Sequence, residues 1–193
     1  RRLRLKVSCA NLRIMKWINH QIVTGFLVYA ATNNAFFVAS SIVGAVIPDR
    51  VEGSPPNNNS RAYWQWRRNH RTWSHYPPIY LSLIALAQGV KFYFPNPTLA
   101  IFLTLITYVL IGCLLHIAED GICGKVPIFK PRKKHGLKLF KVGSWQEYFF
   151  SALIIFSCLA FSFSDVFIEE FNLRERLTQI QEHIIINCGI RNR

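Results

Sequence analysis

The residues His70-Arg71-Thr72-Trp73-Ser74-His75 lie between a polar stretch and a long apolar run that starts at Pro77. Two histidines five residues apart, beside a segment of membrane length, are difficult to explain by packing alone. Imidazole nitrogens bind Zn²⁺, Mn²⁺ and Fe²⁺ well when carboxylates join them. The stretch therefore predicts the centre of a metal site, to which the rest of the chain brings further ligands.

Hydrophobic and charged residues are segregated along the chain of 193 residues, which is 51% hydrophobic and has a formal net charge of +13. Charge is absent from four long runs, residues 21–48, 76–90, 92–118 and 148–164. About 20 apolar residues cross the hydrocarbon core of a bilayer, and a charge inside a span is costly. We therefore expect an all-α fold, a multi-pass integral membrane bundle of about four to five helices.

The basic charge has a second interpretation, which is nucleic-acid binding. The lysines and arginines lie in short loops beside the apolar runs, where orientation in the membrane explains them. We therefore disfavour nucleic acid as a partner and expect the lipid bilayer instead.

The chain divides into three expected parts: a basic amphipathic N-terminal segment at 1–19, a membrane domain at 20–168 and an amphipathic C-terminal tail at 169–193. Met15 is the only methionine, so translation could begin there and residues 1–14 need not be native. Within the domain we expect polar loops at 50–73 and 119–146, and spanning helices at 77–94, 98–117 and 148–168.

Residues 20–49 can cross the membrane in two ways. One helix of this length would place His20 and Asp49 on opposite faces, whereas a hairpin turning at Thr32-Asn33-Asn34 would place them on the same face. Consecutive asparagines form turns and are costly in lipid, so they favour the hairpin. With the hairpin, the positive-inside rule makes the face that holds the basic loops cytoplasmic.

The hairpin also brings every candidate ligand to that one face. The expected metal ligands are histidines and aspartates at helix ends or in the loop before residue 77: His20, Asp49, His70, His75, His116 and Asp120. His116 and Asp120 are four residues apart, so a helix projects both from one side. We expect Zn²⁺ or Mn²⁺, as one or two ions. Glu147 is a further ligand or the general base, and Arg71 is placed to bind an anionic substrate oxygen.

These residues resemble the YdjM-like family of membrane-bound metal-dependent hydrolases of bacteria. The resemblance runs from about residue 15 to about residue 150, and its motifs follow in order: His20, Pro48-Asp49, the His70–His75 segment, His116–Asp120, Val126-Pro127 with Pro131, and Gly143–Glu147. Two positions depart from the pattern. Val51 stands where a second aspartate is expected, with Glu52 as a neighbouring substitute, and Thr72 stands in place of glycine.

The resemblance implies a hydrolase of the bacterial inner membrane, with residues 20–168 as its domain. We expect activated water to attack a phosphoester or related ester of a small-molecule or lipid-derived substrate at the membrane interface. Two alternatives remain open: a non-catalytic scaffold with a degenerate metal site, and a metal or proton transporter. Transport ranks lower because it predicts ionisable groups deep in the spans, which are almost free of them.

Overall fold

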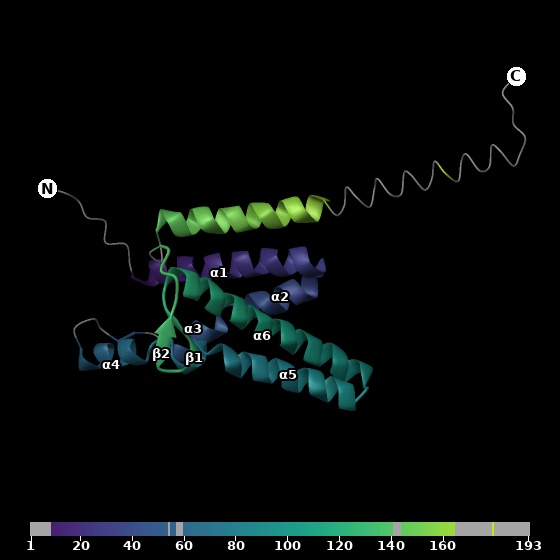
Figure 1. Cartoon of the computed structure of the whole chain (residues 1–193), viewed down its shortest axis with the longest axis horizontal. Helices are drawn as coiled ribbons and strands as arrows, with labels where there is room; N and C mark the ends of the chain where they lie inside the picture. The colour runs from purple at the N-terminus through teal and green to yellow at the C-terminus, as the bar shows by residue number, and fades with distance from the viewer. Residues whose placement is uncertain (1–8, 54, 57–59, 141–143, 165–178, 180–193) are drawn as a thin grey trace, which may run out of the picture.

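The structure is a computed structural model that describes residues 9–53, 55–56, 60–140, 144–164 and 179, with side chains from residue 17 onward (Figure 1). It is mostly helical. The expected tail at 169–193 falls, apart from residue 179, outside the described residues. The boundary expected between residues 19 and 20 falls inside the first helix, α1 (Cys9–Thr32).

The expected hairpin at residues 20–49 is confirmed, with its turn at the two asparagines. Asn33 has a φ of 47°, in the left-handed region that asparagine tolerates better than most residues. Asn34 then caps α2 (Ala35–Gly44), because its Oδ1 accepts hydrogen bonds from the Phe36 and Phe37 amides at 3.0 and 3.3 Å. The returning arm is short, since α2 has 10 residues and is followed by α3 (Ile47–Glu52).

A second hairpin joins α5 (Pro77–Tyr93) to α6 (Pro97–Cys123). Each helix has proline in its first turn, where the missing amide hydrogen costs nothing. Gln88 Nε2 donates to Thr107 Oγ1 at 2.9 Å, which ties the two helices together within their apolar stretch.

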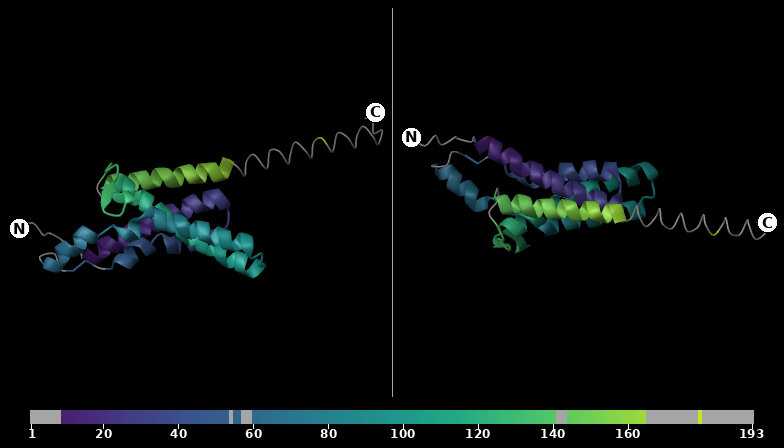
Figure 2. Two further views of the ribbon diagram at one scale, coloured as in Figure 1. Left: turned by 60° about the horizontal axis from the view of Figure 1, so that its bottom comes forward. Right: turned by 90° about the horizontal axis from the view of Figure 1, so that it is seen from above.

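Two helices among the described residues are long and apolar enough to cross a membrane: α6, with 27 residues, and Trp145–Ser164, with 20. The second of these runs beside α1 in Figure 1, and Figure 2 shows the two helices from two further sides. Asn19 Nδ2 donates to Ser151 Oγ between them at 3.0 Å. The expected class, a helical membrane protein, is therefore supported. The expected four to five spans are not established, because α5 has 17 residues and α2 is shorter still.

Both expected polar loops contain regular structure, which corrects the interpretation from composition. The first contains α4 (Arg61–Asn69), the last residues of α3 and the first residue of the 3-10 turn η1 (Trp73–His75). Its α4 forms because Ser60 Oγ accepts the Tyr63 amide at 3.1 Å and so caps the helix.

In the second loop, α6 continues to Cys123 and an antiparallel hairpin of β1 (Val126–Lys130) and β2 (Lys133–His135) follows. The fold is thus helical with one small β-hairpin, rather than all-α. This hairpin reaches the His70–His75 segment through Tyr76, whose hydroxyl donates to the Phe129 carbonyl at 3.2 Å.

The contact between α2 and α6 is built on two glycines. A Cβ added at Gly112 would lie 2.0 Å from the Ser41 carbonyl oxygen, and one added at Gly44 would lie 1.9 Å from the Val109 carbonyl oxygen. Small residues let helix backbones approach this closely. Because His116 lies one turn after Gly112 and α3 follows Gly44 directly, this contact places the end of α6 against α3.

Candidate metal centre

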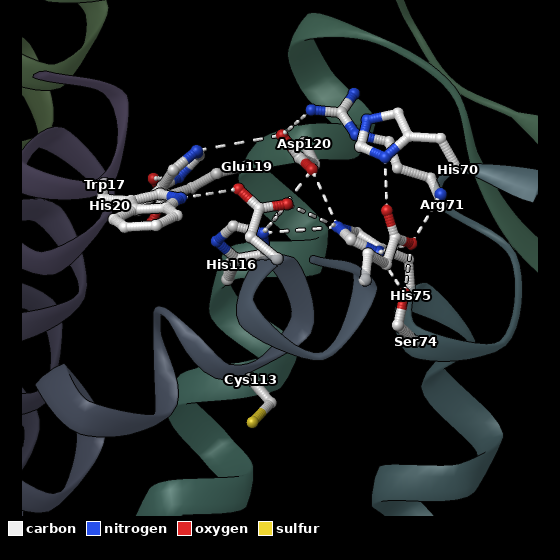
Figure 3. A network of polar contacts seen from close by, with 12 residues as sticks. Trp17, His20, His70, Arg71, Ser74, His75, Cys113, His116, Glu119 and Asp120 are labelled. Atoms are coloured by element: carbon white, nitrogen blue, oxygen red, sulfur yellow. Dashed lines mark hydrogen bonds and ion pairs between the residues drawn. The ribbon is translucent and has the colours of Figure 1, made fainter. Parts of the chain in front are cut away.

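Four side chains from three elements converge at the end of the bundle. Asp49 of α3, His75 of η1, and His116 and Asp120 of α6 each offer one ligand atom, and these atoms lie within 4.8 Å of one another. Figure 3 shows His75, His116 and Asp120 pointing toward one another. His75 Nε2 lies 3.2 Å from Asp120 Oδ2, 3.5 Å from Asp49 Oδ1 and 3.4 Å from His116 Nε2.

These separations fit one tetrahedral cation. His116 Nε2 lies 3.7 Å from Asp49 Oδ1 and 3.6 Å from Asp120 Oδ2, which completes five of the six edges. Ligand bonds of about 2.0–2.2 Å in a tetrahedron give edges of about 3.3–3.6 Å. The observed edges match this range closely, so the four residues could hold a metal ion.

Buried polar atoms in the cluster also fit a cation. The side chains of His75, His116 and Asp120 are almost fully buried, whereas that of Asp49 is 23% exposed. Among the described residues, Asp120 Oδ2 and His116 Nδ1 have no hydrogen-bond partner. Leaving a buried acceptor unsatisfied is costly, and positive charge at the centre, either a cation or a proton on His75 Nε2, would satisfy Asp120 Oδ2.

Glu52 organises the segment that supplies His75. Its Oε1 lies 3.1 Å from His75 Nδ1 and accepts the Arg71 amide at 2.6 Å, and it also accepts the Ser74 hydroxyl. A carboxylate at Nδ1 selects the tautomer with its proton there, which leaves the Nε2 lone pair facing the cluster. Glu52 therefore supports a ligand without being one of the four.

The His70 side chain, predicted as a ligand, lies outside the cluster. Its Nδ1 contacts Glu52 Oε2, whereas His75 lies at the other oxygen of that carboxylate, Oε1. The chain turns at Arg71, whose φ of 56° is in the left-handed region, and this separates His70 from His75. The side chain of Val51, at the position of the missing aspartate, is 73% exposed and absent from the cluster.

His20 lies beside the cluster rather than in it. Its ring centroid is 4.4 Å from that of His116, and its Nε2 is 3.8 Å from Asp120 Oδ1. His20 Nδ1 contacts Glu119 Oε2 at 2.6 Å. Reasoning from the sequence missed Glu119, although an acidic residue next to Asp120 at the end of an apolar helix was a usable signal.

Glu147 contacts α1 and is not among the four residues of the cluster. Its Oε1 accepts a hydrogen bond from Asn19 Nδ2 at 3.2 Å, and its side chain is buried. It lines a small cavity together with His20 and Glu119. The structure therefore connects Glu147 to this neighbouring pair.

The outer oxygens of both cluster aspartates accept hydrogen bonds. Arg71 Nη2 donates to Asp120 Oδ1 at 2.6 Å, and Trp17 Nε1 donates to Asp49 Oδ2 at 3.0 Å. Each bond leaves the other oxygen of its carboxylate directed at the cluster. Arg71, predicted to bind substrate, thus contacts a cluster aspartate in this structure.

Charges within the cluster shift the pKa values of Asp49 and His75, two members that lie outside the membrane-spanning helices. Burial raises the pKa of Asp49, but contacts with His116 and His75 outweigh it and hold this pKa well below its usual range. Burial lowers the pKa of His75, but the surrounding carboxylates of Asp120, Asp49 and Glu52 raise it to about 10. The metal-free centre therefore holds a proton at His75 near neutral pH, in the place that a cation would take.

Comparison with known proteins places the chain in one family. Searches among the curated proteins and the solved structures found no match. A family model described as YdjM inner membrane protein matches residues 15–182, a range that contains every residue of the cluster and its surroundings. Because the match covers most of the chain, this protein belongs to the family of YdjM inner membrane proteins.

Proposed function

We propose that the chain is a multi-pass, metal-dependent hydrolase of the bacterial inner membrane, with its centre at the cytoplasmic face. The observation that carries the proposal is the convergence of Asp49, His75, His116 and Asp120 at tetrahedral spacing. Two imidazoles and two carboxylates form a donor set that suits Zn²⁺ or Mn²⁺. The donor set, its burial and the membership of an inner membrane family support this assignment together.

The bound cation would supply a Lewis acid and lower the pKa of water, which is what hydrolysis of a phosphoester or related ester requires. The protein's own groups hold the four ligands in place. Glu52 orients His75, and Trp17 and Arg71 orient the two aspartates. Arg71 also offsets part of the negative charge of Asp120.

Two carboxylates near His20 are candidates for taking up a proton during hydrolysis. Glu147, the base expected from the sequence, is joined to α1 through Asn19. Glu119 contacts His20 at 2.6 Å, and His20 in turn faces Asp120. We assign the proton to the Glu119–His20 pair, with Glu147 as the alternative. Glu119→Gln would then lower kcat by about 10²–10⁴-fold while metal stays bound, and Glu147→Gln would lower it less.

Metal content of detergent-purified protein tests the proposal directly. We expect stoichiometric Zn²⁺ or Mn²⁺ in the wild type and its loss in His75→Ala and Asp120→Ala. His135→Ala is the matched control, because His135 lies in β2 and outside the cluster. Equal metal in the wild type and in His75→Ala would rule the centre out. Metal that depends on His75, with no hydrolysis of phosphoesters or lipid esters, would support the scaffold alternative.

A further inference from the structure

Two adjoining hollows lie along α1, and together they form a groove from near the candidate metal centre into the apolar part of the bundle. Its first section, between α1, α2 and α3, is lined by Trp17, Val46 and Arg50, and its second section, between α1 and α2, by Ile22 and Tyr29. Both sections share Ile18 and Gln21. Their volumes are about 870 and 690 Å³, open solvent at the mouth included.

The two ends of the groove differ in chemistry. At the end near the centre, the Arg50 guanidinium lies 4.9 Å from the centroid of the Trp17 ring and is exposed. Apart from Gln21 and Gly25, the other section is lined by aliphatic and aromatic side chains, among them Ile22, Phe26 and Ile42. A positive charge followed by an apolar trough complements an anionic headgroup followed by a hydrocarbon chain.

The groove also has the right position and length for a lipid. From Trp17 to Tyr29 the axis of α1 rises about 18 Å, slightly more than the depth of one leaflet in a hydrocarbon core of about 30 Å. At the polar end Trp17 donates to Asp49 Oδ2, and Asp49 is the most exposed residue of the cluster. A headgroup beside Arg50 would therefore lie next to the centre.

An uncharged apolar hollow on the same molecule offers a contrast. The hollow between α2 and α6 is lined by Phe36, Ile101 and Leu105, and among the described residues it has no charged side chain in its lining. Its residues also lie away from the cluster, at the opposite end of α6. The groove along α1 thus differs from a general apolar surface in its charge and its connection to the centre.

We propose that this groove binds a lipid with an anionic, phosphate-type headgroup at Arg50 and an acyl chain along α1. The proposal deepens the proposed function, on which it rests for the substrate class: such a lipid is the molecule whose ester would be presented to the centre. Arg50 and Trp17 bind the headgroup, and Ile22, Phe26 and Tyr29 contact the chain.

Lipid retention in native mass spectrometry tests the groove without turnover. The probes are myristyl phosphonate, whose carbon–phosphorus bond is not an ester, the neutral myristyl alcohol, and methyl phosphonate, which lacks the chain. We expect the wild type to retain one myristyl phosphonate in preference to the other two. Arg50→Gln should weaken phosphonate retention about tenfold, the effect of one charge-assisted contact, and leave the alcohol unchanged.

A pair of matched substitutions tests the apolar section. Ile22→Trp fills the groove and should weaken retention of the phosphonate and the alcohol alike, whereas Ile101→Trp fills the uncharged hollow and should weaken neither. Both isoleucines are exposed, at 43% and 66%, so both variants are expected to fold. Equal effects of the two substitutions, a headgroup preference that survives Arg50→Gln, or a dimer that covers the groove and excludes lipid would overturn the proposal.

Metal content measured on the same samples separates this proposal from the proposed function. Metal without selective lipid retention would refute the groove and leave the hydrolase standing. Selective retention without metal would refute the hydrolase and leave the lipid-binding groove standing. Strong binding of methyl phosphonate alone would show that the site takes free phosphate rather than a lipid, and would also overturn the groove.

Discussion

Glu52→Gln isolates the contribution of a residue that supports the centre without belonging to the four ligands. The carboxylate contacts His75 Nδ1, the Arg71 amide and the Ser74 hydroxyl, so it fixes both the tautomer of His75 and the path of the backbone before it. Glutamine keeps one oxygen acceptor but loses the charge. Its NH₂ group would face the Arg71 amide and the Ser74 hydroxyl, which donate to the carboxylate in the wild type.

We expect this substitution to weaken metal binding by about 10–100-fold, the usual effect of removing a supporting carboxylate. That ratio corresponds to about 1.4–2.8 kcal/mol of binding free energy. The loss should be partial, because the four ligands remain. Competition with a fluorescent zinc chelator in detergent measures the dissociation constant.

Val51→Ala is the control for this experiment, because Val51 adjoins Glu52 in α3 and points into the surroundings. It should leave metal affinity unchanged. Unchanged affinity in Glu52→Gln would refute the assignment of the His75 tautomer. A comparable loss in both variants would mean that α3 has been disturbed as a whole.

Three further outcomes follow from the geometry. His70→Ala should retain most of the metal that His75→Ala loses, as elemental analysis would show, because His70 contacts Glu52 alone among the carboxylates of the site. Metal affinity should rise about tenfold per pH unit between about pH 6 and 8, since the cation must displace the proton that a pKa of about 10 keeps on His75, and chelator competition at several pH values measures this. Gly112→Leu should destabilise the bundle by about 1–3 kcal/mol or more in detergent unfolding, while Gly89→Leu, with open space around it, should be nearly neutral.

Patterns of local origin could be predicted from the sequence. The spacing of His116 and Asp120 placed both on one face of α6, and both are in the cluster. The asparagine pair at residues 33–34 indicated the turn that returns the chain toward Asp49. Both follow from the geometry of a single helix or turn, which the nearby sequence determines.

Features that depend on packing between elements could not be predicted. The spacing of His70 and His75 does not reveal that the chain turns at Arg71 and sends one histidine to Glu52. Glu119 lies about 100° around the helix from Asp120, and only the packing of α1 shows that this direction meets His20. Which residues reach the metal centre therefore depends on the positions of neighbouring helices as well as on the periodicity of each helix.

The hydrogen bonds around the cluster bear on the number of ions. A second ion beside the first would need the outer oxygen of a shared aspartate, as bridging carboxylates provide in two-metal sites. Arg71 Nη2 already binds Asp120 Oδ1 at 2.6 Å, and Trp17 Nε1 binds Asp49 Oδ2 at 3.0 Å. His20, the nearest further imidazole, faces the oxygen that Arg71 holds. We therefore expect one equivalent of metal in the wild type by elemental analysis, and two equivalents would contradict this expectation.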